Sequence, residues 1–196
     1  MINWDSSDGV RDVIRKKMSQ HAPKIILELG TFAARGTEAM AKYVSSYTKD
    51  AVQIFTIDAG VPLDWAVATK TYLPKKIGGW DAVVKMRKHR LNKRYPFCEI
   101  TYIEGSTIDV LPNLMDRVKT WDFCFHDATH LPETMLIDFD LIEPFSHSGS
   151  VIIFDDADGN FQKIFPVHTK GEWEIEIVSD SSDPGKPSKI LIGVRK

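Results

Sequence analysis

The sequence predicts an α/β fold built on a doubly wound, seven-stranded and mostly parallel sheet with helices on both faces. Five short apolar runs alternate with helical segments between residues 24 and 154, which is typical of parallel strands joined by crossover helices. Two further strand-like runs follow, separated by the turn-rich segment SDSSDPGKPS at 179–188. These last two runs predict a C-terminal antiparallel strand pair.

The pattern of apolar residues places each element. Val10, Val13, Ile14 and Met18 fall on one face of a first helix, and apolar runs of strand length then alternate with longer amphipathic segments. The expected strands are 24–29, 51–57, 99–103, 121–125, 151–154, 173–178 and 189–194. The expected helices are 10–18, 37–47, 79–93, 108–118 and 132–142. Residues 161–167 are expected to form no more than one short helical turn.

Length and composition indicate one globular domain over residues 1–196. Its expected parts are an N-terminal helix at 1–22, an insert at 59–97 that could cap a substrate, and a β-hairpin at 173–196. Hydrophobic residues make up 43% and charged residues 27% of the chain, which excludes collagen, a disulfide scaffold and wholesale disorder. The formal net charge of −2 gives no general attraction to nucleic acid or to anionic membranes.

The two cysteines predict a reducing compartment. Cys98 and Cys124 both lie in apolar, strand-like runs, so we expect buried free thiols. The polar N-terminus lacks the pattern of a signal peptide, and no apolar run approaches the ~18 residues that span a bilayer. We therefore expect a cytoplasmic protein without a membrane partner.

Polar and glycine residues follow every strand of the predicted parallel sheet. Such sheets bind their ligands beyond the C-terminal ends of the strands. The first strand leads into Gly30, the second ends at Asp58, and the third leads into Gly105 and Ser106. The fourth leads into F-H-D-A-T-H at 125–130, and the fifth into the acidic pair Asp155 and Asp156.

These strand-end motifs resemble those of class I S-adenosylmethionine-dependent methyltransferases. The likeness is greatest to the small-molecule O-methyltransferases of the macrocin and cephalosporin-tailoring type. Three segments carry it: E-L-G-T-F-A-A-R-G-T at 28–37, T-I-D at 56–58, and F-H-D-A-T-H followed by a helix and S-G-S-V-I-I-F-D-D at 148–156. The resemblance spans residues 24–158 by motif and the last two strands by topology. It implies a Rossmann-like fold and S-adenosylmethionine as the cofactor.

One loop departs from the pattern of that family. The family usually has G-x-x-x-G with Ser or Thr two residues on, whereas here Ala34 replaces the second glycine. Gly36 then occupies the place of the hydroxyl residue, and Thr37 follows. The motif G-x-G-x-x-G is absent, which argues against a dinucleotide cofactor.

The resemblance implies a cofactor site along the first four strand ends. Gly30 would let the backbone pass the amino-acid tail of the cofactor. Asp58 would accept both ribose hydroxyls, since two adjacent carboxylate oxygens suit two adjacent donors. The full predicted set is Glu28, Gly30, Thr31, Phe32, Asp58, Gly105, Ser106 and Asp127. Glu28 could instead hold the loop, and Ser106 could instead cap the following helix.

Three carboxylates predict a metal site. The fourth and fifth strands should be neighbours, so Asp127, Asp155 and Asp156 should meet and repel one another unless a cation offsets their charge. Hard oxygen ligands suit Mg²⁺ or Mn²⁺, which could bind a substrate hydroxyl and lower its pKa. His130 is expected to act as the general base together with Asp127 at the catalytic centre. His126 should point away from Asp127 and pack internally.

The substrate side is less determined. Trp65, Tyr72 and Trp80 could line an aromatic pocket, although aromatic residues in such a segment more often form local core. The basic run at 85–94 is either a solvated helix face or a site for an anionic substrate or RNA.

The sequence favours a metal-assisted O-methyltransferase that acts on a small hydroxylated molecule. Nucleic acid is not expected as a partner, and the resemblance allows a homodimer. Three alternatives remain: a metal-independent methyltransferase that uses His130 alone, a non-catalytic binding domain that has kept the fold, and an RNA methyltransferase, which only the basic run at 85–94 supports.

Overall fold

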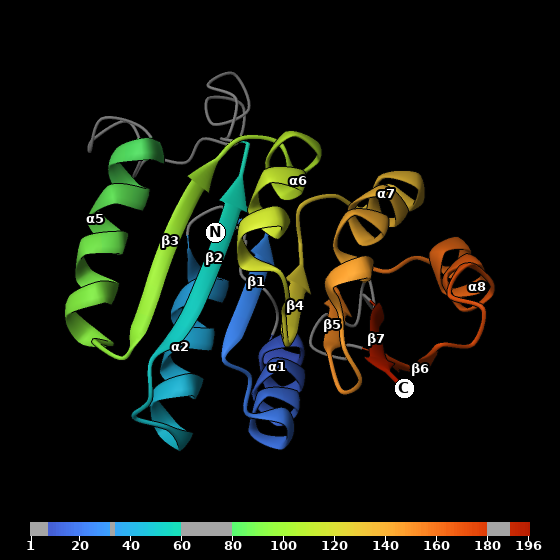
Figure 1. The fold of residues 1–196 in the computed structure, drawn as a ribbon, viewed down its shortest axis with the longest axis horizontal. Helices are drawn as coiled ribbons and strands as arrows, with labels where there is room; N and C mark the ends of the chain where they lie inside the picture. The colour runs from blue at the N-terminus through green and yellow to red at the C-terminus, as the bar shows by residue number, and fades with distance from the viewer. Residues whose placement is uncertain (1–7, 32–33, 60–79, 180–188) are drawn as a thin grey trace.

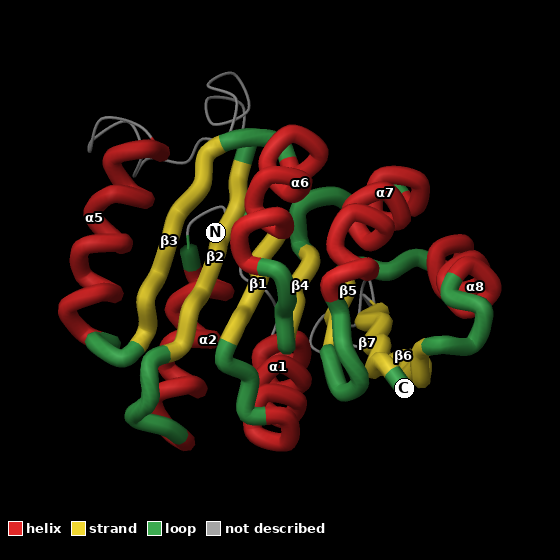
Figure 2. Tube along the Cα trace, in the orientation of Figure 1, coloured by secondary structure: helices red, strands yellow, loops and turns green. Residues whose placement is uncertain are grey.

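The computed structural model describes residues 8–31, 34–59, 80–179 and 189–196. A seven-stranded sheet in the order β3-β2-β1-β4-β5-β7-β6 runs through the middle of the molecule, with helices in front of it and behind it (Figures 1 and 2). Neighbours among β1 to β5 pair in parallel, while β7 runs antiparallel to both β5 and β6. The predicted doubly wound sheet with a C-terminal antiparallel pair is confirmed.

The strands lie within two residues of their expected bounds. They are β1 (Ile25–Leu29), β2 (Val52–Asp58), β3 (Cys98–Glu104), β4 (Phe123–His126), β5 (Val151–Phe154), β6 (Trp173–Ser179) and β7 (Lys189–Arg195). Every residue of β4 and β5 is buried, because helices cover both faces of the sheet there. This is why these strands are continuous apolar runs rather than alternating ones.

Among the described residues, three helices contribute to the core on each face of the sheet. The helices are α1 (Asp8–His21), α2 (Arg35–Tyr47), α5 (Trp80–Arg94), α6 (Thr107–Val118), α7 (Pro132–Ile142) and α8 (Gly159–His168), with a 3₁₀ turn at Glu143–Phe145. Side chains of α1, α2 and α5 pack into one apolar cluster, and side chains of α6, α7 and α8 into another. Successive strand residues alternate between the two: Ile26 belongs to the first cluster, Leu27 and Leu29 to the second.

One helix is longer than the sequence predicted. Residues 159–168 form the ten-residue helix α8 rather than a single helical turn. Asp158 caps it by accepting hydrogen bonds from the backbone N–H of Asn160 and Phe161. Phe161 and Phe165, four residues apart, are fully buried against the sheet, and this packing carries the helix through Pro166.

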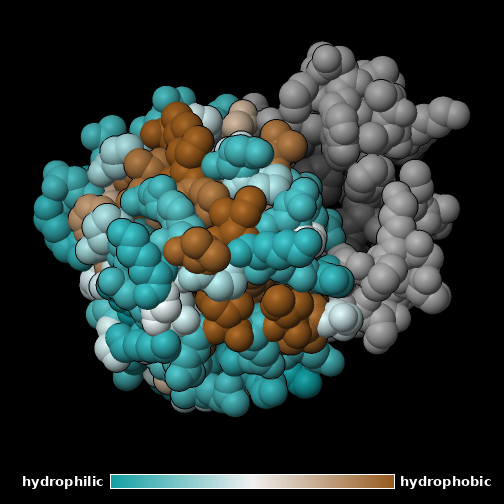
Figure 3. All heavy atoms as spheres, turned by 90° about the vertical axis from the view of Figure 1, so that its right-hand side faces the viewer, coloured by the Kyte–Doolittle hydropathy of each residue, from teal (hydrophilic) through white to brown (hydrophobic). Residues whose placement is uncertain are grey.

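The face formed by α7, α8 and β6 carries several groups of apolar side chains separated by polar ones (Figure 3). Its exposed large hydrophobic residues are Ile137, Ile164, Val167 and Ile177. Single exposed apolar residues of this kind are common on soluble domains. Among the helices that the structure describes, none has the length and apolar character needed to cross a membrane.

Both cysteines, Cys98 and Cys124, are buried free thiols, as predicted. Burial is the main cause that raises the pKa of each thiol. Neither side chain therefore offers a reactive thiolate near neutral pH.

Candidate active site

Backbone hydrogen bonds continue the parallel ladder past the ends of the strands and align the loops that follow. The N–H groups of Gly30, Gly105, Asp127 and Asp155 each donate to a carbonyl of a neighbouring strand at 2.7–3.0 Å. The residues predicted from the strand ends therefore start from one edge of the sheet. This edge is the upper one in Figure 1, where β1 to β5 end.

Gly30 joins the first of these loops to β4. Its φ of +96° lies in a region that favours glycine. A Cβ atom here would lie 2.6 Å from the carbonyl carbon of Asp127 and 2.7 Å from the N of Ala128. Backbone atoms cannot give way at that distance, so the position requires glycine for this close approach.

Glu28 lies beneath the same loop with only 1% of its surface exposed. Its Oε2 accepts hydrogen bonds from the hydroxyls of Thr37, in α2, and Thr56, in β2, both at 2.5 Å. The hydroxyl of Thr31 in turn contacts that of Thr56. Thus the side chains of Glu28 and Thr31 point into the protein, which favours the loop-holding interpretation of Glu28.

Burial raises the pKa of Glu28 to about 7. The nearby charge of Asp58 also raises this pKa, while the hydrogen bonds from Thr37 and Thr56 lower it. Glu28 is therefore a carboxyl group that changes charge near neutral pH.

The three acidic residues at the ends of β4 and β5 lie near one another. The pKa of Asp127 is well above its usual range, first because the group is buried and then because Asp155, Glu28 and Asp156 add negative charge around it. Asp155 is buried, and its Oδ1 accepts a hydrogen bond from the N–H of Asp156 at 2.9 Å. Within the described ranges, however, no group of three His, Cys, Asp or Glu side chains has the arrangement of a metal site.

His130 lies beside this acidic group. Its Nδ1 is 3.5 Å from Oδ2 of Asp156, and about half of each side chain is exposed. Asp156 has a φ of +49°, a conformation that residues other than glycine rarely adopt and that is often found at functional sites. An imidazole beside a carboxylate can accept a proton from a bound hydroxyl.

The loop after β3 shows a structural role for one predicted residue. Ser106 is the N-cap of α6, and its hydroxyl also donates to the carboxylate of Asp109 at 2.6 Å. Gly105, with a φ of +146°, donates its N–H to the carbonyl of Asp58 and so links the ends of β2 and β3. The backbone of this loop, rather than the Ser106 hydroxyl, remains available to a cofactor.

His126 packs internally, as expected. It is fully buried, and its Nε2 lies 2.9 Å from Oδ2 of Asp138 on α7. The other oxygen of Asp138 accepts a hydrogen bond from Thr107 on α6 at 2.5 Å. This buried group ties the end of β4 to two helices.

Several predicted residues lie outside the part of the chain that the structure describes. They are Phe32 of the cofactor set and Trp65 and Tyr72 of the substrate set, together with the side chain of Trp80.

Sequence reasoning missed Thr56 and Gly36. Thr56 lies inside an apolar strand, and its role depends on facing Glu28 of the neighbouring strand. Gly36 was noticed only as a departure from the family pattern, but a Cβ there would overlap Oε1 of Glu28. Motif spacing signals neither contact.

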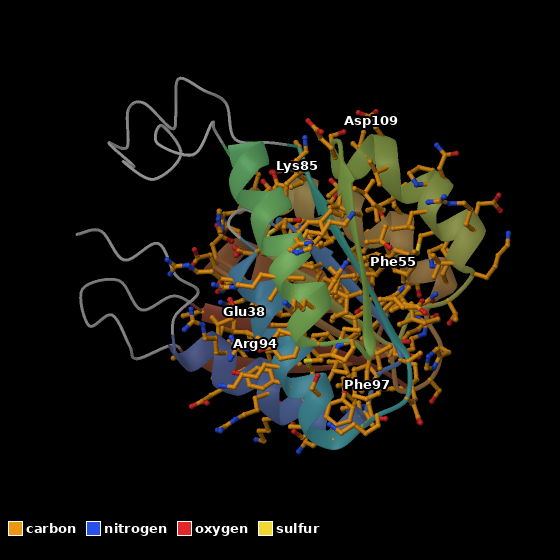
Figure 4. The ribbon with its side chains drawn as sticks, turned by 90° about the vertical axis from the view of Figure 1, so that its left-hand side faces the viewer. Glu38, Phe55, Lys85, Arg94, Phe97 and Asp109 are labelled. Carbon is orange, nitrogen blue, oxygen red and sulfur yellow. The ribbon has the colours of Figure 1, made fainter. Side chains whose placement is uncertain are left out.

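The basic run lies on α5 and is partly neutralised. Arg90 and Arg94 both pair with Glu38 of α2, at 3.1 and 3.3 Å, and Figure 4 shows Arg94 close to Glu38. Lys88 lies over the ring of Tyr102 at 5.6 Å. These contacts favour a solvated helix face over a nucleic-acid site.

The sheet order, its antiparallel last strand and the glycine and acidic residues at its C-terminal edge define a class I S-adenosylmethionine-dependent methyltransferase. The chain belongs to a methyltransferase domain family, whose model matches residues 27–157. The suspected family and the Rossmann-like fold are thereby confirmed. No curated protein matches the chain.

Solved structures share the fold at low sequence identity. One is the O-methyltransferase TomG from Streptomyces achromogenes, involved in tomaymycin synthesis, in complex with S-adenosylmethionine: 14% identity, all of this chain and 83% of that one covered, TM-score 0.66. An O-methyltransferase from Bacillus cereus bound to S-adenosylhomocysteine has 17% identity, 98% and 83% coverage and a TM-score of 0.66. The calicheamicin methyltransferase CalS11 has 17% identity, 95% and 77% coverage and a TM-score of 0.64.

Proposed function

We propose that this methyltransferase transfers the methyl group of S-adenosylmethionine to a hydroxyl of a small molecule. The observation that carries the acceptor chemistry is the half-exposed His130–Asp156 pair next to Asp127. A base is needed for a hydroxyl, because the oxygen must lose its proton as the methyl group arrives. TomG and CalS11, named as an O-methyltransferase and a calicheamicin methyltransferase, have this fold and support a small-molecule acceptor.

The residues present fit the cofactor. Gly30 turns the backbone with a φ of +96° and packs closely against the loop after β4, and Asp58 follows Ile57 of β2, whose carbonyl accepts a hydrogen bond from the N–H of Gly30. We propose that Gly30, Thr31 and Gly105 offer backbone to the cofactor, that Asp58 accepts its ribose hydroxyls and that Asp127 lies near its charged centre. When bound, the sulfonium supplies an activated methyl group, so the protein mainly orients the acceptor and removes its proton.

His130 is the proposed general base. Asp156 lies on the Nδ1 side of the ring, which leaves Nε2 to take the hydroxyl proton. The positive charge that forms on the ring would be stabilised by Asp156 and by the neighbouring carboxylates. His130→Gln should therefore reduce turnover strongly while S-adenosylmethionine still binds.

A divalent cation at Asp127, Asp155 and Asp156 is a second proposal for the same edge of the sheet. The raised pKa of Asp127, caused first by burial and then by Asp155, Glu28 and Asp156, supports it, as does the preference of Mg²⁺ and Mn²⁺ for carboxylate oxygens. These side chains would have to turn toward the ion, since none of the described residues form a ready metal group. A bound cation would lower the pKa of the acceptor hydroxyl.

Calorimetric titration with S-adenosylmethionine, with Mg²⁺ and then with chelator, tests these proposals in order. Micromolar binding supports the cofactor, and methyl transfer to a panel of phenols and sugars then tests the acceptor. A separate Mg²⁺ heat that is lost in Asp155→Ala supports the cation. Turnover that is unchanged in Asp155→Ala and with chelator leaves the metal-independent mechanism.

The non-catalytic alternative rests on the departure at Ala34. It predicts weak cofactor binding and no transfer to any acceptor. The expected substrate cap at 59–97 and a homodimer remain proposals, which cross-linking to a bound substrate and gel filtration would test.

A further inference from the structure

The loop between β1 and α2 is held from inside by one carboxylate. Glu28 of β1 accepts hydrogen bonds from the hydroxyls of Thr37, in the first turn of α2, and of Thr56, in β2. The hydroxyl of Thr56 also contacts that of Thr31 at the start of the loop. Both ends of the loop are thus tied to the same buried group, which is 1% exposed. The positions of Thr31 and Thr37 therefore depend on the place of this carboxylate.

The second oxygen of Glu28 explains the glycine at position 36. A Cβ on Gly36 would overlap Oε1 of Glu28, and it would also lie 3.4 Å from the ring of Phe125. Gly36 lies in α2, and its φ is not among the positive values. The requirement for glycine here is therefore one of space and not of backbone conformation.

At position 34, in contrast to position 36, the backbone conformation favours glycine but the chain has alanine. Ala34 has a φ of +55° and is fully buried, so a residue with a Cβ occupies a left-handed conformation there. Its N–H donates to the carbonyl of Thr31 at 2.7 Å, which closes the turn. The chain thus accommodates alanine at position 34, where the methyltransferase family usually has glycine. It requires glycine at position 36 instead.

We propose that Glu28 and Gly36 form a complementary pair that positions the cofactor loop, with Glu28 acting as a positioning residue through Thr31, Thr37 and Thr56. The effect on the cofactor rests on the proposed function, whereas the pairing itself does not. Two outcomes are expected from this pairing. A side chain at position 36 should displace Glu28, and a shorter acid at position 28 should make room for it.

A double-mutant cycle with Gly36→Ala and Glu28→Asp tests the pairing. In the wild-type background, Gly36→Ala should raise the unfolding equilibrium constant about tenfold to a hundredfold and weaken S-adenosylhomocysteine binding about tenfold. In the Glu28→Asp background, the same substitution should have a much smaller effect on both. Equal effects in the two backgrounds would overturn the proposal.

Two matched controls separate the pairing from a general glycine effect. Gly159→Ala also adds a methyl group near the start of a helix, but it meets nothing within 4 Å, so it should lower neither stability nor affinity. Ala34→Gly should leave cofactor affinity within about threefold of wild type, since the glycine is needed at 36 instead. A large gain in affinity from Ala34→Gly would contradict this.

Variants of Thr37 test the positioning role without altering the space around Glu28. Thr37→Ser keeps the hydroxyl and should retain affinity, while Thr37→Val removes it and should weaken S-adenosylhomocysteine binding about fivefold to tenfold. If wild-type protein binds no S-adenosylhomocysteine, the proposed function fails, but the unfolding cycle still decides the pairing. If wild type binds and both Thr37 variants bind equally well, Glu28 does not position the loop.

Discussion

Two aspartates five residues apart, at opposite ends of β4, have opposite environments. Asp122, just before the strand, accepts hydrogen bonds from the N–H groups of Lys24 and Ile25 at 2.7 and 2.8 Å, and from His147 at 2.8 Å. Asp127, just after the strand, is buried among other carboxylates that raise its pKa. The first stabilises the fold, and the second is a buried acid whose raised pKa a positively charged ligand beside it would lower.

The same contrast applies to the two edges of the sheet. The N-terminal edge is closed by hydrogen bonds between loops, whereas the C-terminal edge combines close backbone approach with repelling acids. Changes at the first edge should therefore alter stability without altering ligand affinity. Changes at the second should alter ligand binding or turnover, and they should not lower stability unless backbone packing is disturbed.

Gly30→Ala should have the largest effect. The added Cβ would overlap backbone atoms of Asp127 and Ala128 in the loop after β4, and a φ of +96° is unfavourable for alanine. We therefore expect the protein to lose about 3 kcal/mol or more of stability and to lose cofactor binding. Gly149→Ala is the matched control, since its φ of +92° is similar but no atom lies within 4 Å of the new Cβ. It should cost about 1–2 kcal/mol in urea unfolding. Equal costs would show that the close approach to β4 is unimportant.

The pH dependence of stability should reveal Glu28. Its folded pKa of about 7 lies above the unfolded value of 4.5, so the folded state binds the extra proton between these two values. The contribution of Glu28 to the free energy of unfolding is therefore largest below pH 4.5, and it falls by about 3 kcal/mol as the pH rises to 7. Urea unfolding at several pH values checks this. Glu28→Gln should flatten the slope, and a slope that persists unchanged would assign it to other groups.

Asp122→Ala should lower stability by about 2 kcal/mol, because two backbone N–H groups and His147 lose their acceptor. Affinity for S-adenosylhomocysteine should stay the same. A parallel loss of affinity would mean that the two edges are coupled.

Asp127→Asn is the counterpart at the other edge. Burial and the neighbouring carboxylates disfavour the ionised form of Asp127 in the folded state, so the neutral amide should raise stability at pH 7 by about 1 kcal/mol while turnover is lost. Thermal unfolding and calorimetry on the same preparation separate the two effects. A destabilised Asp127→Asn variant would show that Asp127 is part of the structural framework.

The smallest effect concerns His147. Its pKa is raised, first by the carbonyl of Ser148 and then by Asp122, although half of the side chain is exposed. Its contribution is complete below pH 6.5 and is lost as the pH rises through the raised folded value. We expect only a few tenths of a kcal/mol, because solvent screens this pair. His147→Gln should remove that part of the pH dependence in unfolding experiments above pH 6.5.

Local patterns were enough for most of the fold. Runs of four to seven residues between amphipathic segments predicted the strands that the structure describes: continuous apolar runs where both faces are buried, as in β4 and β5, and alternating residues where one face is exposed, as in β6. They failed at α8, where Gly159, Asn160 and Pro166 obscure a helix. That helix forms because Asp158 caps it and two phenylalanines pack against the sheet.

The candidate site was predicted less completely. The strand-end rule located Gly30, Asp58, Asp127 and the acidic pair, since parallel strands end at a common edge. It left open whether the Ser106 hydroxyl binds a cofactor or caps the following helix, and it gave no sign that the side chain of Thr31 points inward. The orientation of Thr31 depends on its contact with Thr56 in the neighbouring strand.

The amino-acid sequence by itself determined the class of sheet, the order of its elements and the edge that carries the chemistry, because periodicity and strand ends are local properties. Only the tertiary structure decided which carboxylates are compensated and which are not. Glu28 meets Thr56 and Gly36, and Asp127 meets Asp155, through the register of neighbouring strands and the packing of α2. Charge and space at these positions depend on atoms distant in the chain, so they are set only when the sheet is assembled.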